Sequence, residues 1–221
     1  MTMALRAFFM GLVLWLPMVA LASSDAEALK EYVATNTEQL ADKLDQLRGS
    51  FENDRDRFYR EMEQELQPFV AFRRIAARVM GRYAHQASPE QRDEFVEKFK
   101  RSLFNTYAGA LVDTENFEVK MGDARIMPNH PDRATVDMEI VSGSGKRYKV
   151  TYSMFRKGED QWMMENVIVE GVNIGLAFRE RFESSLEKHR GDIQAVIDDW
   201  TSKLDEFEKK PAQESADNAA Q

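Results

Sequence analysis

The chain has 221 residues, a formal net charge of −8 and no cysteine. This length suits a single domain or one compact unit with two lobes. An acidic chain does not bind nucleic acid through a general basic surface, so we exclude that class of partner. Without cysteine there is no disulfide framework, thiol catalysis or thiolate metal site, and the fold must rest on its apolar core.

The start of the chain has the pattern of an export signal at residues 1–22. Arg6 precedes an apolar run at residues 7–19, and Ala20-Leu21-Ala22 forms an A-x-A cleavage site. The run is short for a membrane span, which makes an uncleaved anchor helix the less favoured alternative. We expect cleavage after Ala22, leaving one soluble, exported domain at residues 23–209.

Residues 25–112 predict a helical lobe, because apolar residues recur there at helical spacing. Three segments have this pattern: 25–47, which Gly49 should end, then 54–66 and 69–83. A fourth helix has the clearest start. The run Ser88-Pro89-Glu90-Gln91 offers an N-cap serine, a proline in the first turn and a glutamine able to close a capping box. The apolar stripe of this helix consists of Phe95, Phe99, Leu103, Tyr107 and Leu111.

Beyond Asp113 the apolar period changes from helical spacing to alternation, which is typical of strands with one buried face. Turn-forming residues separate the strands at 129–132, 142–145 and 157–160. We therefore expect a four-stranded antiparallel sheet at about 116–170. The alternating apolar residues of its first three strands are Phe117, Val119 and Met121, then Val136, Met138 and Ile140, then Tyr148, Val150, Tyr152 and Met154. The fourth strand carries β-branched, aromatic and long apolar residues at Trp162, Met163, Met164, Val167, Ile168 and Val169.

The end of the fourth strand predicts a tight turn into a helix. Glu170-Gly171 can form the turn, and Asn173 can cap a helix over 173–189. A second closing helix is expected at 192–207, so that the closing helices together span 173–207. The polar residues 210–221 should form a disordered tail. The fold class is α+β, with helices packed on one face of the sheet.

The residues offer no clear catalytic constellation. His85, His130 and His189 fall in a loop, a turn and a helix end, where we expect solvated side chains. Glu165 and Glu170 are carboxylates that a base-catalysed isomerase could use if they lay in an apolar pocket. For Glu170, next to the turn, capping or pairing with an arginine is the favoured interpretation. We expect neither a metal site nor a cofactor.

Two further features allow more than one interpretation. Twelve of the 14 phenylalanines and eight of the 12 methionines lie beyond Ala22. Flexible methionines suit the wall of an adaptable cavity, although composition alone favours a solid core. Arg74, Arg78 and Arg82 are spaced four apart and share a helix face. Such a run of arginines usually forms a solvated helix face. The alternative is a surface that docks a partner or is approached by a lipid headgroup.

Two blocks of the sequence resemble the periplasmic phospholipid-binding proteins of the Mla pathway, the MlaC or toluene-tolerance auxiliary family. One block joins Trp162 and Val167 to Val169-Glu170-Gly171-Val172, Phe178-Arg179 and Phe182. The other comprises Val79-Met80-Gly81-Arg82-Tyr83, Ala87-Ser88-Pro89-Glu90-Gln91-Arg92, Phe95, Phe99 and Thr106-Tyr107-Ala108-Gly109-Ala110-Leu111. The chain departs from the family pattern at Glu165-Asn166, Asn173 and Ala177-Phe178, where the family usually has Tyr-Asp, Ser and Asn-Tyr.

The resemblance implies a curled sheet like that of the nuclear-transport-factor-2 superfamily, with helices and sheet enclosing a lipid cavity. It also implies a monomeric periplasmic carrier whose cargo is phospholipid. Its partners would be an outer-membrane lipoprotein–porin complex and an inner-membrane ABC transporter with an MCE-type subunit. The expected cavity wall consists of Val79, Tyr83, Phe99, Leu103, Tyr107, Leu111, Val136, Met138, Ile140, Val150, Tyr152, Met154, Val167 and Val169. The alternatives are an enzyme of curled-sheet type acting on a small apolar substrate, and a periplasmic adaptor without a ligand.

Overall fold

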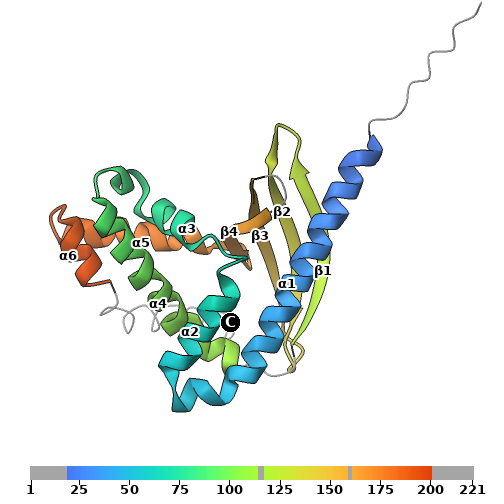
Figure 1. Ribbon diagram of the computed structural model, residues 1–221, viewed down its shortest axis with the longest axis horizontal. Helices are drawn as coiled ribbons and strands as arrows, with labels where there is room; N and C mark the ends of the chain where they lie inside the picture. The colour runs from blue at the N-terminus through green and yellow to red at the C-terminus, as the bar shows by residue number, and fades with distance from the viewer. Residues whose placement is uncertain (1–18, 114–116, 159–160, 201–221) are drawn as a thin grey trace, which may run out of the picture.

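The computed structural model describes residues 19–113, 117–158 and 161–200, without the side chains at 19–24, 110, 111 and 113. In this part of the chain, helices and one antiparallel sheet form a mixed α+β fold, as predicted. Figure 1 shows α1 (Val19–Asn53) crossing the sheet. Beyond β4 (Gln161–Val169) it shows a group of four helices: α3 (Phe72–Met80), α4 (Pro89–Asp113), α5 (Ile174–Lys188) and α6 (Ile193–Asp198). Residues 1–18 of the predicted signal, the polar tail and residues 201–207 of the last predicted helix lie outside the described residues, whereas residues 19–22 belong to the first turn of α1.

The first helix is longer than predicted. Helix α1 (Val19–Asn53) passes through Gly49, which was expected to end it. The helix continues because its last turn still has an apolar partner: the Phe51 ring lies 5.1 Å from that of Phe58 on α2 (Arg55–Leu66). A single glycine costs a helix only about 1 kcal/mol, which this packing outweighs.

The segment predicted as a helix over 69–83 has three parts. Helix α3 (Phe72–Met80) is followed by a short 3-10 helix, η1 (Gly81–His85). Residues 69–71 instead extend along strand β4: Met164 N–H donates to Phe69 O at 2.8 Å, and Ala71 N–H donates to Met164 O at 3.0 Å. The prediction of helix from Phe69 was wrong because these backbone groups pair with a strand that has a free edge.

Helix α4 (Pro89–Asp113) begins as the sequence predicts. Ser88 N–H donates to Gln91 Oε1 at 3.0 Å, and Gln91 N–H donates to Ser88 Oγ at 3.2 Å. These reciprocal bonds form a capping box and satisfy two N–H groups that the helix itself leaves unpaired.

The sheet has five strands in the order β1-β2-β3-β4-β5, one more than predicted. They are β1 (Glu118–Met127), β2 (His130–Val141), β3 (Arg147–Lys157), β4 (Gln161–Val169) and β5 (Val172–Asn173). Residues 130–132, which were predicted to form a turn, belong to β2. The short β5 was missed because its two residues lie between the predicted turn at Glu170-Gly171 and the predicted helix, with Asn173 assigned only as the cap. Glu170 and Gly171, with φ of 50° and 81°, form a two-residue hairpin that pairs Val169 with Val172.

The closing helices begin at the predicted caps. Helix α5 (Ile174–Lys188) has Asn173 as its N-cap, whose side chain accepts from Leu176 N–H at 3.0 Å. Asn166 on β4 donates to the same Asn173 oxygen at 3.1 Å and accepts from Gly175 N–H at 3.1 Å. Helix α6 (Ile193–Asp198) is capped by Asp192. The amide of Asn166 therefore fixes the first turn of α5 to the sheet.

A pair of glycine substitutions tests this junction. A Cβ on Gly175 would lie 2.5 Å from Asn166 Oδ1, whereas a Cβ on Gly49 in α1 would meet nothing within 4 Å. We expect Gly175→Ala to lower the free energy of unfolding by about 1–3 kcal/mol, because the clash breaks the capping network. Gly49→Ala, the matched control, should raise it by about 0.5–1 kcal/mol. Urea unfolding of both variants measures the difference. Equal effects would mean that the Asn166 bonds do not hold the helix.

Candidate functional site

The predicted wall residues of the sheet share one face. The strand register places Val136 opposite Tyr152, and Tyr152 opposite Val167. The next row joins Met138 to Val150 and Val150 to Val169. Because directly paired residues point to the same side of a sheet, the pairing brings the predicted set together. We call this surface the apolar face; its members are Val136, Met138, Ile140, Val150, Tyr152, Met154, Val167 and Val169.

The apolar face is buried at one end and open at the other. Val136 and Met154 are 0% exposed, and Val150 is 4% exposed. Exposure then rises to 38% for Tyr148 and 56% for Val172, although Val172 pairs with Val169 and lies on the same face. The face is therefore continuous with apolar side chains that meet solvent at the end next to β5.

Helix α1 and the segment before α3 cover the buried end. The Tyr32 hydroxyl of α1 donates to Trp162 O at 2.9 Å, and the Tyr152 ring lies 5.9 Å from that of Phe69. Burial raises the pKa of the Tyr152 phenol, and a hydrogen bond with the Thr37 side chain of α1 opposes that shift. Tyr152 thus stays neutral at ordinary pH and contributes apolar surface with one satisfied hydroxyl.

The predicted wall residues of the helices pack mainly against aromatic rings. Val79 and Phe99 are buried, and Tyr83 and Leu103 are partly buried in the same apolar cluster as the sheet residues. Phe99 and Tyr107 contact Phe178 of α5, with ring centroids 5.3 and 6.5 Å apart. Tyr107 is 39% exposed. The Leu111 side chain lies outside the described part of the structure.

Two hollows adjoin these helices. One, of about 510 Å³, is lined by Arg82, Tyr83, Arg179, Glu183, Leu186, Glu187, Arg190 and Gly191. The other, of about 30 Å³, is lined by Thr106, Tyr107, Ala177, Phe178 and Arg181. Each touches one predicted wall residue, Tyr83 or Tyr107, and neither lining includes the sheet. A cavity between helices and sheet is therefore still a prediction.

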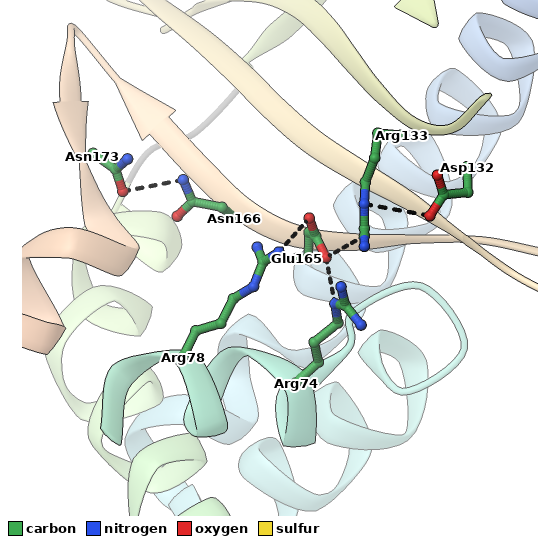
Figure 2. Close-up of polar contacts among 7 residues, drawn as sticks. All are labelled: Arg74, Arg78, Asp132, Arg133, Glu165, Asn166 and Asn173. Carbon is green, nitrogen blue, oxygen red and sulfur yellow. Dashed lines mark hydrogen bonds and ion pairs between the residues drawn. The ribbon is translucent and has the colours of Figure 1, made fainter. Parts of the chain in front are cut away.

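A buried carboxylate gathers three arginines on the other side of the sheet. Glu165 is the extra residue of a β-bulge, between the pairs Met154–Met164 and Ser153–Asn166. Its side chain is 5% exposed. Arg74 Nε lies 2.5 Å from Glu165 Oε2, and Arg78 Nη2 lies 2.9 Å from Oε1. Arg133 of β2 donates to Oε2 at 3.1 Å, as Figure 2 shows.

This cluster changes the interpretation of the predicted arginine set. Arg74 and Arg78 converge on Glu165, whereas Arg82 lies apart and donates to the Tyr83 hydroxyl at 2.7 Å. Arg133 was missed, because no local spacing in the sequence links it to α3 and only the strand register brings it there. Glu170 accepts a hydrogen bond from Lys149 N–H and has no arginine partner among its described contacts. Its side chain thus ties the turn between β4 and β5 to Lys149 of β3.

The remaining polar candidates offer little chemistry. His85 and His130 are exposed, as expected. His189 is only partly exposed, and its Nε2 lies 3.2 Å from Asp199 Oδ2, so the prediction of a purely solvated side chain was wrong there. Among the described residues, no group of histidines and carboxylates is placed to hold a metal ion. No helix in that part is long and apolar enough to cross a membrane.

A family model and two relatives match this chain in sequence. The family model "MlaC protein" matches residues 34–202. The toluene tolerance protein ttg2D of Pseudomonas putida is 30% identical over 210 residues, which cover 95% of this chain and 94% of that protein. The intermembrane phospholipid transport system binding protein MlaC of Haemophilus influenzae is 23% identical over 115 residues, covering 51% and 53% of the two chains.

A solved structure has the same fold. The phospholipid-binding protein of Ralstonia solanacearum, solved in complex with a phospholipid, superimposes with a TM-score of 0.70 at 22% identity. The match covers 79% of this chain and 97% of that one. The predicted fold class is thereby confirmed, and both the family model and the ttg2D match extend over most of the sequence. The chain belongs to the MlaC protein family.

Proposed function

We propose that this chain is a soluble periplasmic carrier that binds the acyl chains of phospholipids. The observation that carries the proposal is the apolar face, which runs from side chains buried under α1 to side chains exposed beside β5. Tyr148 and Val172 extend this buried face to solvent, and apolar surface that continues from a core to solvent is a candidate site for an apolar ligand. The expected cavity wall, from Val79 to Val169, is proposed as the lining for the chains.

Two related proteins support phospholipid as the cargo. One is named as the binding protein of an intermembrane phospholipid transport system, and the Ralstonia structure contains a phospholipid. Membership of the same family extends this ligand class to the present chain. We infer that phospholipid is the cargo and that no metal or nucleotide takes part in holding it.

The energetics fit a carrier. An acyl chain in water costs about 0.8 kcal/mol per methylene, so two long chains require shielding worth about 20 kcal/mol or more. A carrier must hold the lipid about as tightly as a membrane does, because tighter or weaker binding would stall transfer. An apolar face with the headgroup left in water meets this requirement. Selectivity among headgroups should therefore be weak.

The proposal also includes a route for the transported phospholipid. The carrier would move phospholipid between an outer-membrane lipoprotein–porin complex and an inner-membrane ABC transporter with an MCE-type subunit. Such traffic would maintain the lipid asymmetry of the outer membrane. Any energy for directional transport would come from the transporter.

The contacts of the two candidate carboxylates weigh against an enzyme. A general base needs a free oxygen in the substrate pocket. Both oxygens of Glu165 are bonded to arginines, on the side of the sheet away from the apolar face. Glu170 is exposed and bonded to the backbone of Lys149.

Native mass spectrometry of protein purified from its own periplasm tests the proposal. A carrier should bring phospholipid with it, with mixed headgroups. An enzyme for a small apolar substrate, or an adaptor with a solid core, would appear as the bare chain. Finding only the bare chain after mild purification would overturn the carrier proposal.

Val150→Trp tests whether the apolar face holds cargo. Val150 is 4% exposed and lies in the middle of its row, between Met138 and Val169. In a hollow carrier the indole should take the place of an acyl chain, so the folded variant should purify with little or no phospholipid. In a solid core the same change would overpack, costing about 1–3 kcal/mol.

The control is Lys149→Trp, at an exposed position on the opposite side of the same strand. It should leave the lipid content unchanged. Thermal unfolding of delipidated samples completes the test. A large loss of stability in Val150→Trp alone would favour a solid core, and undiminished lipid content would place the cargo elsewhere.

Processing of the chain gives an independent check of the compartment. The A-x-A site at Ala20-Leu21-Ala22 should be cut, so that the mature protein starts at Ser23. N-terminal sequencing of the protein from the periplasmic fraction measures this directly. Recovery with Met1 intact, or only in membranes, would contradict both the export signal and the soluble carrier.

A further inference from the structure

The three arginines around Glu165 form a rigid cationic surface, which we call the arginine triad: Arg74, Arg78 and Arg133. Arg74 and Arg133 each have two kinds of contact, one with an aromatic ring and one with a carboxylate. The Arg74 guanidinium lies 4.3 Å from the centre of the Phe155 ring and Arg133 lies 5.7 Å from it, while both bond to Glu165. Stacking on an aromatic ring and pairing with a carboxylate fix the plane of a guanidinium. Arg74 and Arg133 are therefore ordered before any partner arrives, and Arg78 is held through its ion pair with Glu165.

The triad still presents donors to solvent. The Arg74, Arg78 and Arg133 side chains are 37%, 49% and 28% exposed, whereas Glu165 beneath them is 5% exposed. A guanidinium carries more N–H donors than these contacts with Glu165 use. The buried carboxylate thus orients the arginines from below, and their outer edges face water.

The charge of the cluster differs from that of the chain. Three arginines face two carboxylates, Glu165 and Asp132, the latter 3.5 Å from Arg133 Nε. Three positive and two negative charges leave one positive charge in excess, on a chain whose formal net charge is −8. A local cationic surface on an acidic protein orients an acidic partner as it approaches.

The position of the triad identifies the kind of partner. Arg133 pairs with Phe155, and both alternate with Ala134 and Met154, which belong to the apolar side of the sheet. The triad therefore lies on the opposite side of the sheet from the apolar face. The headgroup of a lipid bound on the apolar face would be separated from it by the sheet. An anionic group that reaches the triad should belong to another protein.

We propose that the arginine triad is a docking site for a carboxylate-rich surface of a partner protein. The proposal rests on the proposed function, which requires the carrier to meet membrane complexes. Carboxylates suit the planar fork of arginine, which can bind them through two parallel hydrogen bonds. Because Glu165 holds all three arginines and Phe155 stacks on two of them, Arg74 and Arg133, docking loses less side-chain entropy than it would with unheld arginines.

Arg78→Gln is the most informative change. Arg78 is the most exposed member, and Glu165 keeps Arg74 and Arg133 when Arg78 is lost. Reversing Arg74 and Arg78 to Glu would instead crowd three carboxylates together and disturb the fold. Association with the purified inner-membrane and outer-membrane complexes can be followed by biolayer interferometry. We expect the association rate at low salt to fall about three- to tenfold for at least one complex, and the difference to shrink at high salt.

Two further variants separate docking from general charge and from folding. Arg101→Gln removes the same charge from an exposed arginine paired with Asp56, and should change the rate less than about twofold. Arg78→Lys keeps the charge but loses the planar fork, so it should associate nearly normally and dissociate faster. Thermal unfolding should show that all three variants are folded.

The outcomes distinguish this proposal from the proposed function. Lipid content, measured by mass spectrometry on the same samples, should be unchanged in Arg78→Gln. Normal association of this variant with both complexes would overturn docking at the triad and leave the carrier intact. Normal association with reduced lipid would also overturn it, since the triad would then be a headgroup contact. Wild-type protein without lipid would contradict the carrier itself.

Discussion

The pairing of strand β4 is the constraint on which the rest of the structure depends. One edge of β4 joins β3, and the other edge is closed by two short segments, residues 69–71 at Met164 and β5 at Ile168 and Val169. Each of these segments leads directly into a helix, α3 in one case and α5 in the other (Figure 1). The backbone hydrogen bonds that would otherwise leave an exposed strand edge therefore also attach the helices to the sheet.

The two faces of the sheet carry different kinds of side chain. On one side, the rows through Val136 and Val150 form the apolar face, which α1 covers at one end and which opens beside β5. On the other side, the bulge at Glu165 turns a carboxylate toward α3 and β2, where arginines satisfy it. In our proposal, apolar cargo and acidic partners therefore use separate surfaces, and neither needs to displace the other. Such a separation would let the proposed carrier meet a membrane complex while its cargo stays shielded.

Much of this could be predicted from the sequence, where the signals are local. The capping box at Ser88 and Gln91 and the cap at Asn173 follow from residue type and spacing, and the alternation along β2 and β3 fixes which residues share the apolar face. The features that were missed depend on distant partners. Residues 69–71 have helical spacing but pair with β4. Helix α1 continues past Gly49 because Phe51 packs against Phe58. Arg133 lies 32 positions from Glu165, and no pattern shorter than the strand register connects them.

The most direct test of the proposed carrier is to locate the acyl chains of a bound phospholipid. Protein with labelled valine and isoleucine methyl groups can be loaded with phospholipid, and nuclear Overhauser effects between acyl methylene protons and these methyls can be recorded. We expect contacts to Val136, Val150 and Val169 on the apolar face and none to Ile168, whose side chain points to the opposite side of β4. Contacts confined to Ile168, or none to the apolar face in lipid-bound protein, would contradict it.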